Sequence, residues 1–219
     1  MILIFDLDGT LLNTIDDLGY ACNYALEQTG YPTYPIEAYP AKVGNGINNL
    51  IRRALPETER TEENILRVRE YFVPYYNDHN CDYTRPYAGI EEVLTTLKAQ
   101  GHQLAVASNK YQAATEKIVN HFFPGVFDVI LGEREGIERK PNPQIVFDIV
   151  NSLQPSAISL LTLYIGDSLV DFETAQNAEV PFIACSWGFV PRERLVEAGV
   201  PTIIDQPIEI LNRLQNHHV

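Results

Sequence analysis

Two aspartates lie two positions apart near the N-terminus, in the run Asp6-Leu-Asp-Gly-Thr10 that follows the apolar residues 2–5. Side chains alternate along a strand, so Asp6 and Asp8 would share a face if the strand continued, and Gly9 lets the backbone turn away beyond them. Burying a carboxylate is costly unless it is paired or binds a metal, so the pair indicates a cation site. Hard oxygen ligands favour Mg²⁺. The alternative is a simple turn at Asp8-Gly9, with Asp6 capping the next helix.

Two further apolar runs also end in polar residues. Ser108 follows residues 104–107, and Asp167 comes just after residues 161–165, with Asp171 one helical turn later. The carboxyl ends of parallel strands meet at one edge of a sheet, where ligands bind. The sequence therefore predicts that these groups converge with the first acidic pair in one crevice.

A proline-rich loop, Arg139-Lys140-Pro-Asn-Pro143, lies between two of the apolar runs. Proline restricts the backbone, so the loop would be rigid and could hold Lys140 over that crevice. A lysine in a loop is usually only solvated. Here the acidic neighbours favour a role in the site.

The elements that must position these residues alternate along the chain, which is typical of an α/β fold with a doubly wound, Rossmann-like parallel sheet. Helical patterns separate the apolar runs, and proline at the start or glycine at the end supports several of them. We expect strands at 2–5, 103–107, 128–131, 161–165, 181–185 and 202–204, and helices that include 89–100, 143–153 and 170–178.

Composition narrows the function classes. The chain has 219 residues and a net charge of −13, with no basic cluster longer than Arg52-Arg53, which argues against a nucleic-acid partner. No apolar stretch approaches the roughly 18 residues of a membrane helix, and the N-terminal residues lack the charged and apolar regions expected of a signal peptide. We expect no membrane partner, a cytoplasmic location and reduced, unpaired cysteines.

With these motifs the chain resembles the haloacid dehalogenase superfamily of aspartyl phosphohydrolases. Four motifs appear in that family's order and span essentially the full length of the chain. They are the run from Asp6 to Thr10, then Ser108, then Lys140, and finally Asp167 with Asp171. The similarity is strongest to its phosphoglycolate phosphatase-like members. It rests on Asp8-Gly-Thr-Leu-Leu12, Ser108-Asn-Lys110, Lys140-Pro-Asn-Pro143 and Gly44-Asn-Gly46.

The resemblance implies a two-step hydrolysis of a phosphate monoester. Asp6 would be the nucleophile that forms a phosphoaspartate, and Asp8 would protonate the leaving oxygen and then activate water. Ser108 would hydrogen-bond the transferring phosphoryl group, and Lys140 would offset the repulsion between nucleophile and phosphate.

The resemblance also implies a Mg²⁺ site. Its ligands would be the Asp6 carboxylate, the Asp8 backbone carbonyl and Asp167, with Asp171 acting through a bound water.

Residues 14–83 depart from the strand and helix alternation, and this is where the family inserts a helical cap. The resemblance therefore implies a small α-helical cap at 14–83 on a catalytic core made of 1–13 and 84–219. Helically spaced apolar residues stop at Gly30, and Thr61 before two glutamates predicts a helix N-cap. The two connections would allow hinge closure over the substrate.

Three residues are assigned to substrate binding. Arg53 matches a cap arginine of similar phosphatases and could bind a substrate carboxylate. Gly46, in Gly44-Asn-Gly46, could offer backbone N–H groups to an anion, or the segment could simply be a turn leading into a helix. Asn109 is the third.

The most consistent function is a Mg²⁺-dependent phosphatase for a small phosphorylated metabolite, with 2-phosphoglycolate as the best candidate, in a monomer or homodimer. Asp8 argues against dehalogenase or phosphonatase chemistry, and Lys42 is better interpreted as a solvated or anion-attracting lysine than as a Schiff-base residue. A sugar-phosphate phosphomutase or a pyrophosphatase on the same scaffold is the alternative. A silent binding module would be expected to lack one of the motif residues.

Overall fold

The computed structural model describes residues 1–153 and 162–215. The chain separates into two compact units, one made of Met1–Leu12 with Pro86–Val219 and the other of Asn13–Arg85. We call them the core unit and the helical unit. Their boundaries fall within two residues of those expected for the core and the cap.

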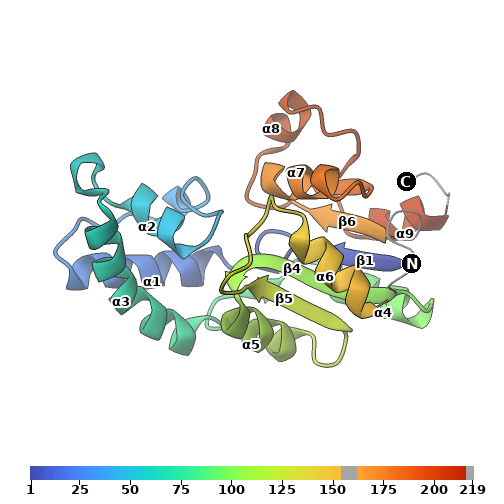
Figure 1. Ribbon diagram of the computed structural model, residues 1–219, viewed down its shortest axis with the longest axis horizontal. Coiled ribbons are helices and arrows are strands. Elements are labelled where there is room, and N and C mark those ends of the chain that lie inside the picture. The colour runs from blue at the N-terminus through green and yellow to red at the C-terminus, as the bar shows by residue number, and fades with distance from the viewer. Residues whose placement is uncertain (154–161, 216–219) are drawn as a thin grey trace. The chain divides into compact units, whose positions relative to one another are not determined.

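The core unit contains a parallel sheet, which confirms the predicted α/β, Rossmann-like fold (Figure 1). Among the described residues it has six strands in the order β5-β4-β1-β6-β7-β8. In that order they are Val129–Glu133, Gln103–Tyr111, Ile2–Phe5, Thr162–Gly166, Phe182–Cys185 and Ile203–Ile204. Residue 161, expected to begin β6, lies outside the described residues.

Strand β1 occupies the switch point of this sheet. Leu3 of β1 pairs with Leu104 of β4 on one side and with Leu163 of β6 on the other. The three strands that carry the sequence motifs are therefore neighbours, and their carboxyl ends lie at one edge. This is the position at which doubly wound sheets bind ligands.

Helices surround the sheet (Figure 1). Apolar side chains of α6 and α7 form one cluster with Ile2 and Ile4 of β1, so Leu3 and Phe5 point to the opposite face. The helices of the core unit are α4 (Ile90–Ala99), α5 (Gln112–Phe122), α6 (Gln144–Leu153), α7 (Leu169–Asn177), α8 (Arg192–Glu197) and α9 (Ile208–Gln215).

The helical unit is built on α1 (Ile15–Gln28), which packs against α3 (Glu62–His79), with α2 (Ile47–Ala54) beside them. Apolar residues of α1 recur at helical spacing and are buried. The Thr61 side chain accepts a hydrogen bond from the backbone of Asn64, so the predicted N-cap is confirmed. Short 3₁₀ turns lie at Ile36–Ala38 and Glu57–Glu59.

The chain crosses between the units twice, and these two segments pair as the short strands β2 (Leu12–Asn13) and β3 (Arg85–Pro86). No helix among the described residues has both the length and the apolar character that a membrane span requires.

Candidate active site

Asp6 emerges directly from the carboxyl end of β1 and is buried. Its backbone N–H donates to the carbonyl of Ile165 at 2.9 Å, which ties it to the neighbouring strand. Gly9, three residues on, has φ of +94°, a conformation that favours glycine. A Cβ atom at Gly9 would lie 2.4 Å from an Asp167 oxygen, so glycine is also needed for the close approach of the turn to this carboxylate.

Lys140 reaches into the same place from the loop between β5 and α6, and it is only 3% exposed. Its Nζ donates to Asp6 Oδ1 and to Asp171 Oδ1, both at 2.7 Å, and to the carbonyl of Ala107 at 2.8 Å. The predicted convergence of Lys140 with the acidic residues is therefore present. Burial lowers the pKa of Lys140, but the charges of Asp171 and Asp6 outweigh this and hold the pKa above its ordinary value.

Asn109 fixes the backbone of Lys140. Its side-chain oxygen accepts from the Lys140 N–H at 2.9 Å, and its amide nitrogen donates to the Lys140 carbonyl at 3.1 Å. Asn109, which lies on β4, was expected to bind substrate. Both polar atoms of its side-chain amide instead hydrogen-bond to the backbone of Lys140 and so position the loop that carries this lysine.

Asp167 follows β6 and is held by the loop after β7. Its Oδ2 accepts from the backbone N–H of Phe189 at 2.7 Å, and its Oδ1 from the Thr10 hydroxyl at 3.3 Å. A Cβ atom at Gly188 would lie 2.3 Å from Asp167, so this loop can approach only through glycine. The Trp187 indole donates to the carbonyl of Thr10 at 3.1 Å, which gives this residue a role in holding the turn.

Asp171 lies at the first turn of α7 and forms a capping box with Ser168. Its Oδ2 accepts from the Ser168 hydroxyl at 2.6 Å, while its Oδ1 faces Lys140. Each oxygen of this carboxylate therefore has a hydrogen-bond donor within the protein.

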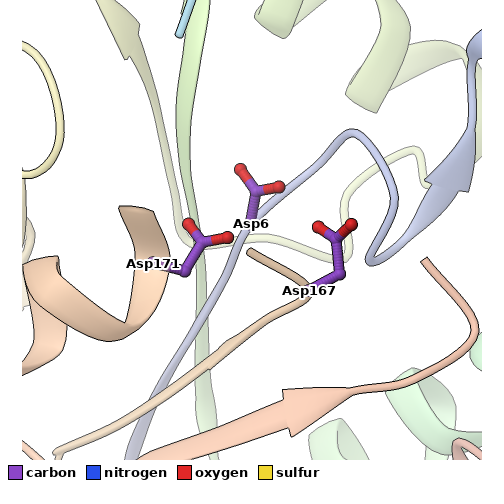
Figure 2. A group of neighbouring side chains, drawn as sticks. All are labelled: Asp6, Asp167 and Asp171. Atoms are coloured by element: carbon purple, nitrogen blue, oxygen red, sulfur yellow. The ribbon is translucent and has the colours of Figure 1, made fainter. Parts of the chain in front are cut away.

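Asp6, Asp167 and Asp171 form an acidic cluster in which one ligand oxygen from each lies within 4.8 Å of the others. Figure 2 shows the three side chains side by side, with Asp6 between Asp167 and Asp171. All three are buried, and the charge of Lys140 offsets one of theirs. Buried carboxylates in excess over their cation fit a divalent metal ion with a preference for oxygen ligands.

The electrostatics support this fit. Burial raises the pKa of Asp6 well above its ordinary value, and the Asp171 charge raises it further while Lys140 lowers it. Burial and then the Asp171 charge raise the pKa of Asp167 to about 7, although hydrogen bonds from Phe189 and Thr10 oppose the change. A bound cation would lower both values, because it stabilises the ionised carboxylates.

The remaining two catalytic candidates lie at the same edge. Ser108 is buried within β4, which runs beyond the predicted end at 107, and its hydroxyl accepts from the backbone of Lys110 at 3.1 Å. Asp8 lies 3.0 Å from the ammonium group of Lys110, measured from Oδ1 to Nζ. The sequence motif assigns no role to Lys110, because a lysine that follows an expected strand does not reveal its partner.

The residues assigned to the substrate in the helical unit have local partners. Arg53 Nη1 lies 3.0 Å from the carbonyl oxygens of Lys42, Val43 and Gly44, so the side chain holds this loop. Gly46 has φ of +82° and directly precedes α2. The Lys42 ammonium lies over the Tyr34 ring, 4.1 Å from its centroid, an engaged position rather than a freely solvated one.

Comparison with known proteins identifies the class to which this fold and site belong. The family model described as haloacid dehalogenase-like hydrolase matches residues 3–185, and the chain belongs to this family of enzymes.

Its relatives point to one group within that family. The chain is 30% identical to the phosphoglycolate phosphatase of Haemophilus influenzae strain 86-028NP over 96% of each chain. It is 32% identical to that of Mannheimia succiniciproducens, over 84% of this chain and 85% of the other. A crystal structure from Lactobacillus delbrueckii subsp. bulgaricus, provisionally described as a phosphoglycolate phosphatase, is 36% identical, with a TM-score of 0.90 and 95% of each chain covered.

Proposed function

We propose that this protein is a Mg²⁺-dependent phosphatase that hydrolyses a small phosphate monoester through a phosphoaspartate at Asp6. The observation that carries the proposal is the Asp6 carboxylate at the switch point, 2.7 Å from Lys140 Nζ and clustered with two further buried acids. A nucleophile placed in this way has the Lys140 ammonium group beside it and carboxylates that could bind a metal ion. That is what attack on a polyanionic phosphate requires.

The metal would be held by Asp6, Asp167 and the Asp8 backbone carbonyl. Both oxygens of Asp171 have donors within the protein, which supports a role for Asp171 through a metal-bound water. Bound Mg²⁺ would neutralise phosphate charge and fix the orientation of the ester.

In the first step, an Asp6 oxygen forms a bond to phosphorus while the bond from phosphorus to the leaving oxygen breaks. Asp8 gives its proton to that oxygen, so an alcohol departs. Lys140 keeps positive charge beside Asp6 as the two anions approach, and Ser108 donates to the transferring phosphoryl group.

In the second step, water attacks the phosphoaspartate and the bond between Asp6 and phosphorus breaks. Asp8, now ionised, takes a proton from the water, so the aspartate and inorganic phosphate are released and the starting state is restored. One residue thus acts first as acid and then as base.

The proposed substrate is 2-phosphoglycolate, and the names of the similar curated relatives support it. We retain Arg53 as the candidate that recognises its carboxylate. The contacts from Arg53 Nη1 to the carbonyls of residues 42–44 would hold the guanidinium group in place to bind the substrate. Alternatively, Arg53 would serve only to stabilise this loop. A comparison of substrates with and without a carboxylate separates the two.

The test is a panel of phosphate esters assayed with Mg²⁺, with excess chelator and with Ca²⁺. We expect hydrolysis of an aryl phosphate and of 2-phosphoglycolate with Mg²⁺, no turnover in chelator, and inhibition by Ca²⁺, whose looser coordination disturbs the attacking carboxylate. Full activity in chelator would remove the metal from the mechanism. Preference for pyrophosphate, or isomerisation of a sugar phosphate, would replace the proposed reaction by one of its alternatives.

A further inference from the structure

Tyr164 places a buried hydroxyl behind the lysine of the site. It lies on β6, is completely buried, and packs in the apolar cluster beneath α6 and α7, with its ring centroid 6.1 Å from that of Phe182. Its hydroxyl lies 3.1 Å from Lys140 Nζ and 3.2 Å from Asp171 Oδ1. Nothing in the spacing of the sequence motifs indicated this residue.

The donors and acceptors around Lys140 determine where the Tyr164 hydroxyl directs its hydrogen. An ammonium group has three N–H donors, and Asp6, Asp171 and Ala107 accept at 2.7, 2.7 and 2.8 Å. The contact with Tyr164 is the longest of four. The ammonium group has no acceptor for the tyrosine hydrogen, so that hydrogen is directed elsewhere, and Asp171 Oδ1 at 3.2 Å is a closer acceptor than the Ala107 carbonyl at 3.4 Å.

This donation immobilises Asp171. Its Oδ1 accepts from Lys140 and Tyr164, and its Oδ2 accepts from the Ser168 hydroxyl and, at 3.2 Å, from the Ser168 backbone N–H. A carboxylate held by four donors is a fixed acceptor for Lys140. With two N–H groups of Lys140 directed at Asp171 and the Ala107 carbonyl, the remaining N–H stays directed at Asp6.

The core does not need a hydroxyl at this position. The cluster around Tyr164 consists of side chains such as Ile4, Ala105 and Phe182, and a phenylalanine would fill the same space. Burying a polar hydroxyl among apolar groups costs free energy unless it is hydrogen-bonded. The hydroxyl is therefore explained by its partners rather than by packing.

We propose that Tyr164 is a positioning residue, whose hydroxyl fixes Asp171 and so keeps Lys140 directed at the nucleophile. The inference rests on the proposed role of Asp6 and Lys140 in phosphoryl transfer. Partners that orient the ligands of a metal typically contribute about 10- to 100-fold to activity, and we take the same range for a partner that orients Lys140. We expect a loss of this size in kcat, with KM changed less than about twofold.

The experiment compares Tyr164→Phe with Thr162→Val in the full-length protein. Thr162 lies two residues earlier on β6, and its hydroxyl has no hydrogen-bond partner in the part of the chain that the structure describes, so Thr162→Val is the matched control. Steady-state kinetics on an aryl phosphate is the first measurement. The second is the ¹⁵N-lysine side-chain spectrum, in which the Lys140 ammonium signal is identified by its loss in Lys140→Met.

We expect Tyr164→Phe to lower kcat and to speed hydrogen exchange of the Lys140 signal, while Thr162→Val changes neither. In a Lys140→Met background, Tyr164→Phe should have no further effect on kcat, because a residue that acts through another loses its effect with it. Wild-type kcat, an unchanged lysine signal, or additive losses in the double variant would overturn the proposal. If no phosphate ester is hydrolysed by the wild type, the proposed function fails, while the lysine signal still decides whether Tyr164 anchors Lys140.

Discussion

Both units bury aspartates, but the neighbours of these residues differ. Asp17 in the helical unit is 2% exposed and accepts from the backbone N–H groups of Tyr83 and Thr84 at 2.9 Å and from the Thr84 hydroxyl at 2.7 Å. Asp6 and Asp167 in the core unit are buried beside another acid, Asp171. Burial alone therefore does not distinguish the two environments. The difference is that Asp6 and Asp167 lie beside a further buried carboxylate, whereas the hydrogen-bond partners of Asp17 are neutral donors.

Arginine and lysine show the same contrast. Lys140 in the core unit is directed at two carboxylates, whereas Arg53 in the helical unit donates to carbonyls of its own loop. The core unit thus has the buried, closely spaced charges that are typical of an active site. The polar contacts described for the helical unit stabilise its own fold.

Among the variants that keep Asp6, loss of the proposed general acid should have the largest effect. We expect Asp8→Asn and Asp8→Ala to lower kcat by about 10² to 10⁴, the usual contribution of general acid–base catalysis. With an activated ester, whose leaving group needs no proton, phosphoenzyme should accumulate, since Asp8 must also activate the water. Rapid-quench kinetics measures both, and wild-type turnover in either variant would exclude Asp8 from the reaction.

Arg53→Ala tests whether the helical unit contributes to substrate choice. If Arg53 binds a substrate carboxylate, its loss should cost about 2 to 5 kcal/mol in kcat/KM for 2-phosphoglycolate. A neutral aryl phosphate should lose far less. Equal losses on both substrates would show that Arg53 serves only to hold residues 42–44.

Gly188→Ala should disturb Asp167 through packing alone. The added methyl group would lie 2.3 Å from that carboxylate, so the loop must shift and the hydrogen bond from Phe189 must lengthen. We expect a loss of stability of about 1 to 3 kcal/mol, the usual cost of overpacking, and weaker Mg²⁺ binding. Ser186→Ala, in the same loop, removes a hydrogen bond to the exposed Asp205 and is the matched control. Equal stability and Mg²⁺ affinity in the two variants would contradict this account of the loop.

The pH dependence of stability should report on Asp167. The folded-state pKa of Asp167 is raised to about 7, so between about pH 4 and 7 the unfolded chain gives up a proton that the folded protein keeps. Without metal, this group makes the protein less stable as the pH rises through that window. Mg²⁺ should offset the loss.

Thermal unfolding from pH 4 to 8, with and without Mg²⁺, checks this expectation. Asp167→Asn should flatten the metal-free decline and reduce the stabilisation by Mg²⁺. Asp17→Asn should lower the melting temperature while leaving the Mg²⁺ effect as in the wild type. The same metal response in both variants would show that the two buried acids do not differ as we argue.

Much of this arrangement could be predicted from the sequence, because local patterns encode it. The apolar run of β1 and the acids after it gave both the strand and the expected edge of the sheet. The strand expected to end at residue 107 continues to Tyr111, which pairs with Glu133 after a register shift that follows Ala107. The polar side chains of Ser108 and Asn109 in this irregular stretch hide the strand pattern in the sequence.

The contacts that could not be predicted join residues distant in the chain. The capture of the Lys140 backbone by Asn109 spans 31 positions, and the contact between Tyr164 and Lys140 spans 24. The carbonyl partners of Arg53 depend on a loop that has positive φ at Gly44, Asn45 and Gly46. Residue type and spacing carry no direct signal for any of these contacts.

The most direct test of the central claim is the identity of the residue that carries the phosphate. Asp8→Ala protein, mixed with an activated phosphate ester and Mg²⁺ and then quenched in acid, should show by peptide mass mapping one phosphate on Asp6. The double variant Asp6→Asn/Asp8→Ala, treated in the same way, should carry no phosphate. The single variant Asp6→Asn should have no turnover. Phosphate on any other residue, or turnover in Asp6→Asn, would contradict the assignment of Asp6 as the nucleophile.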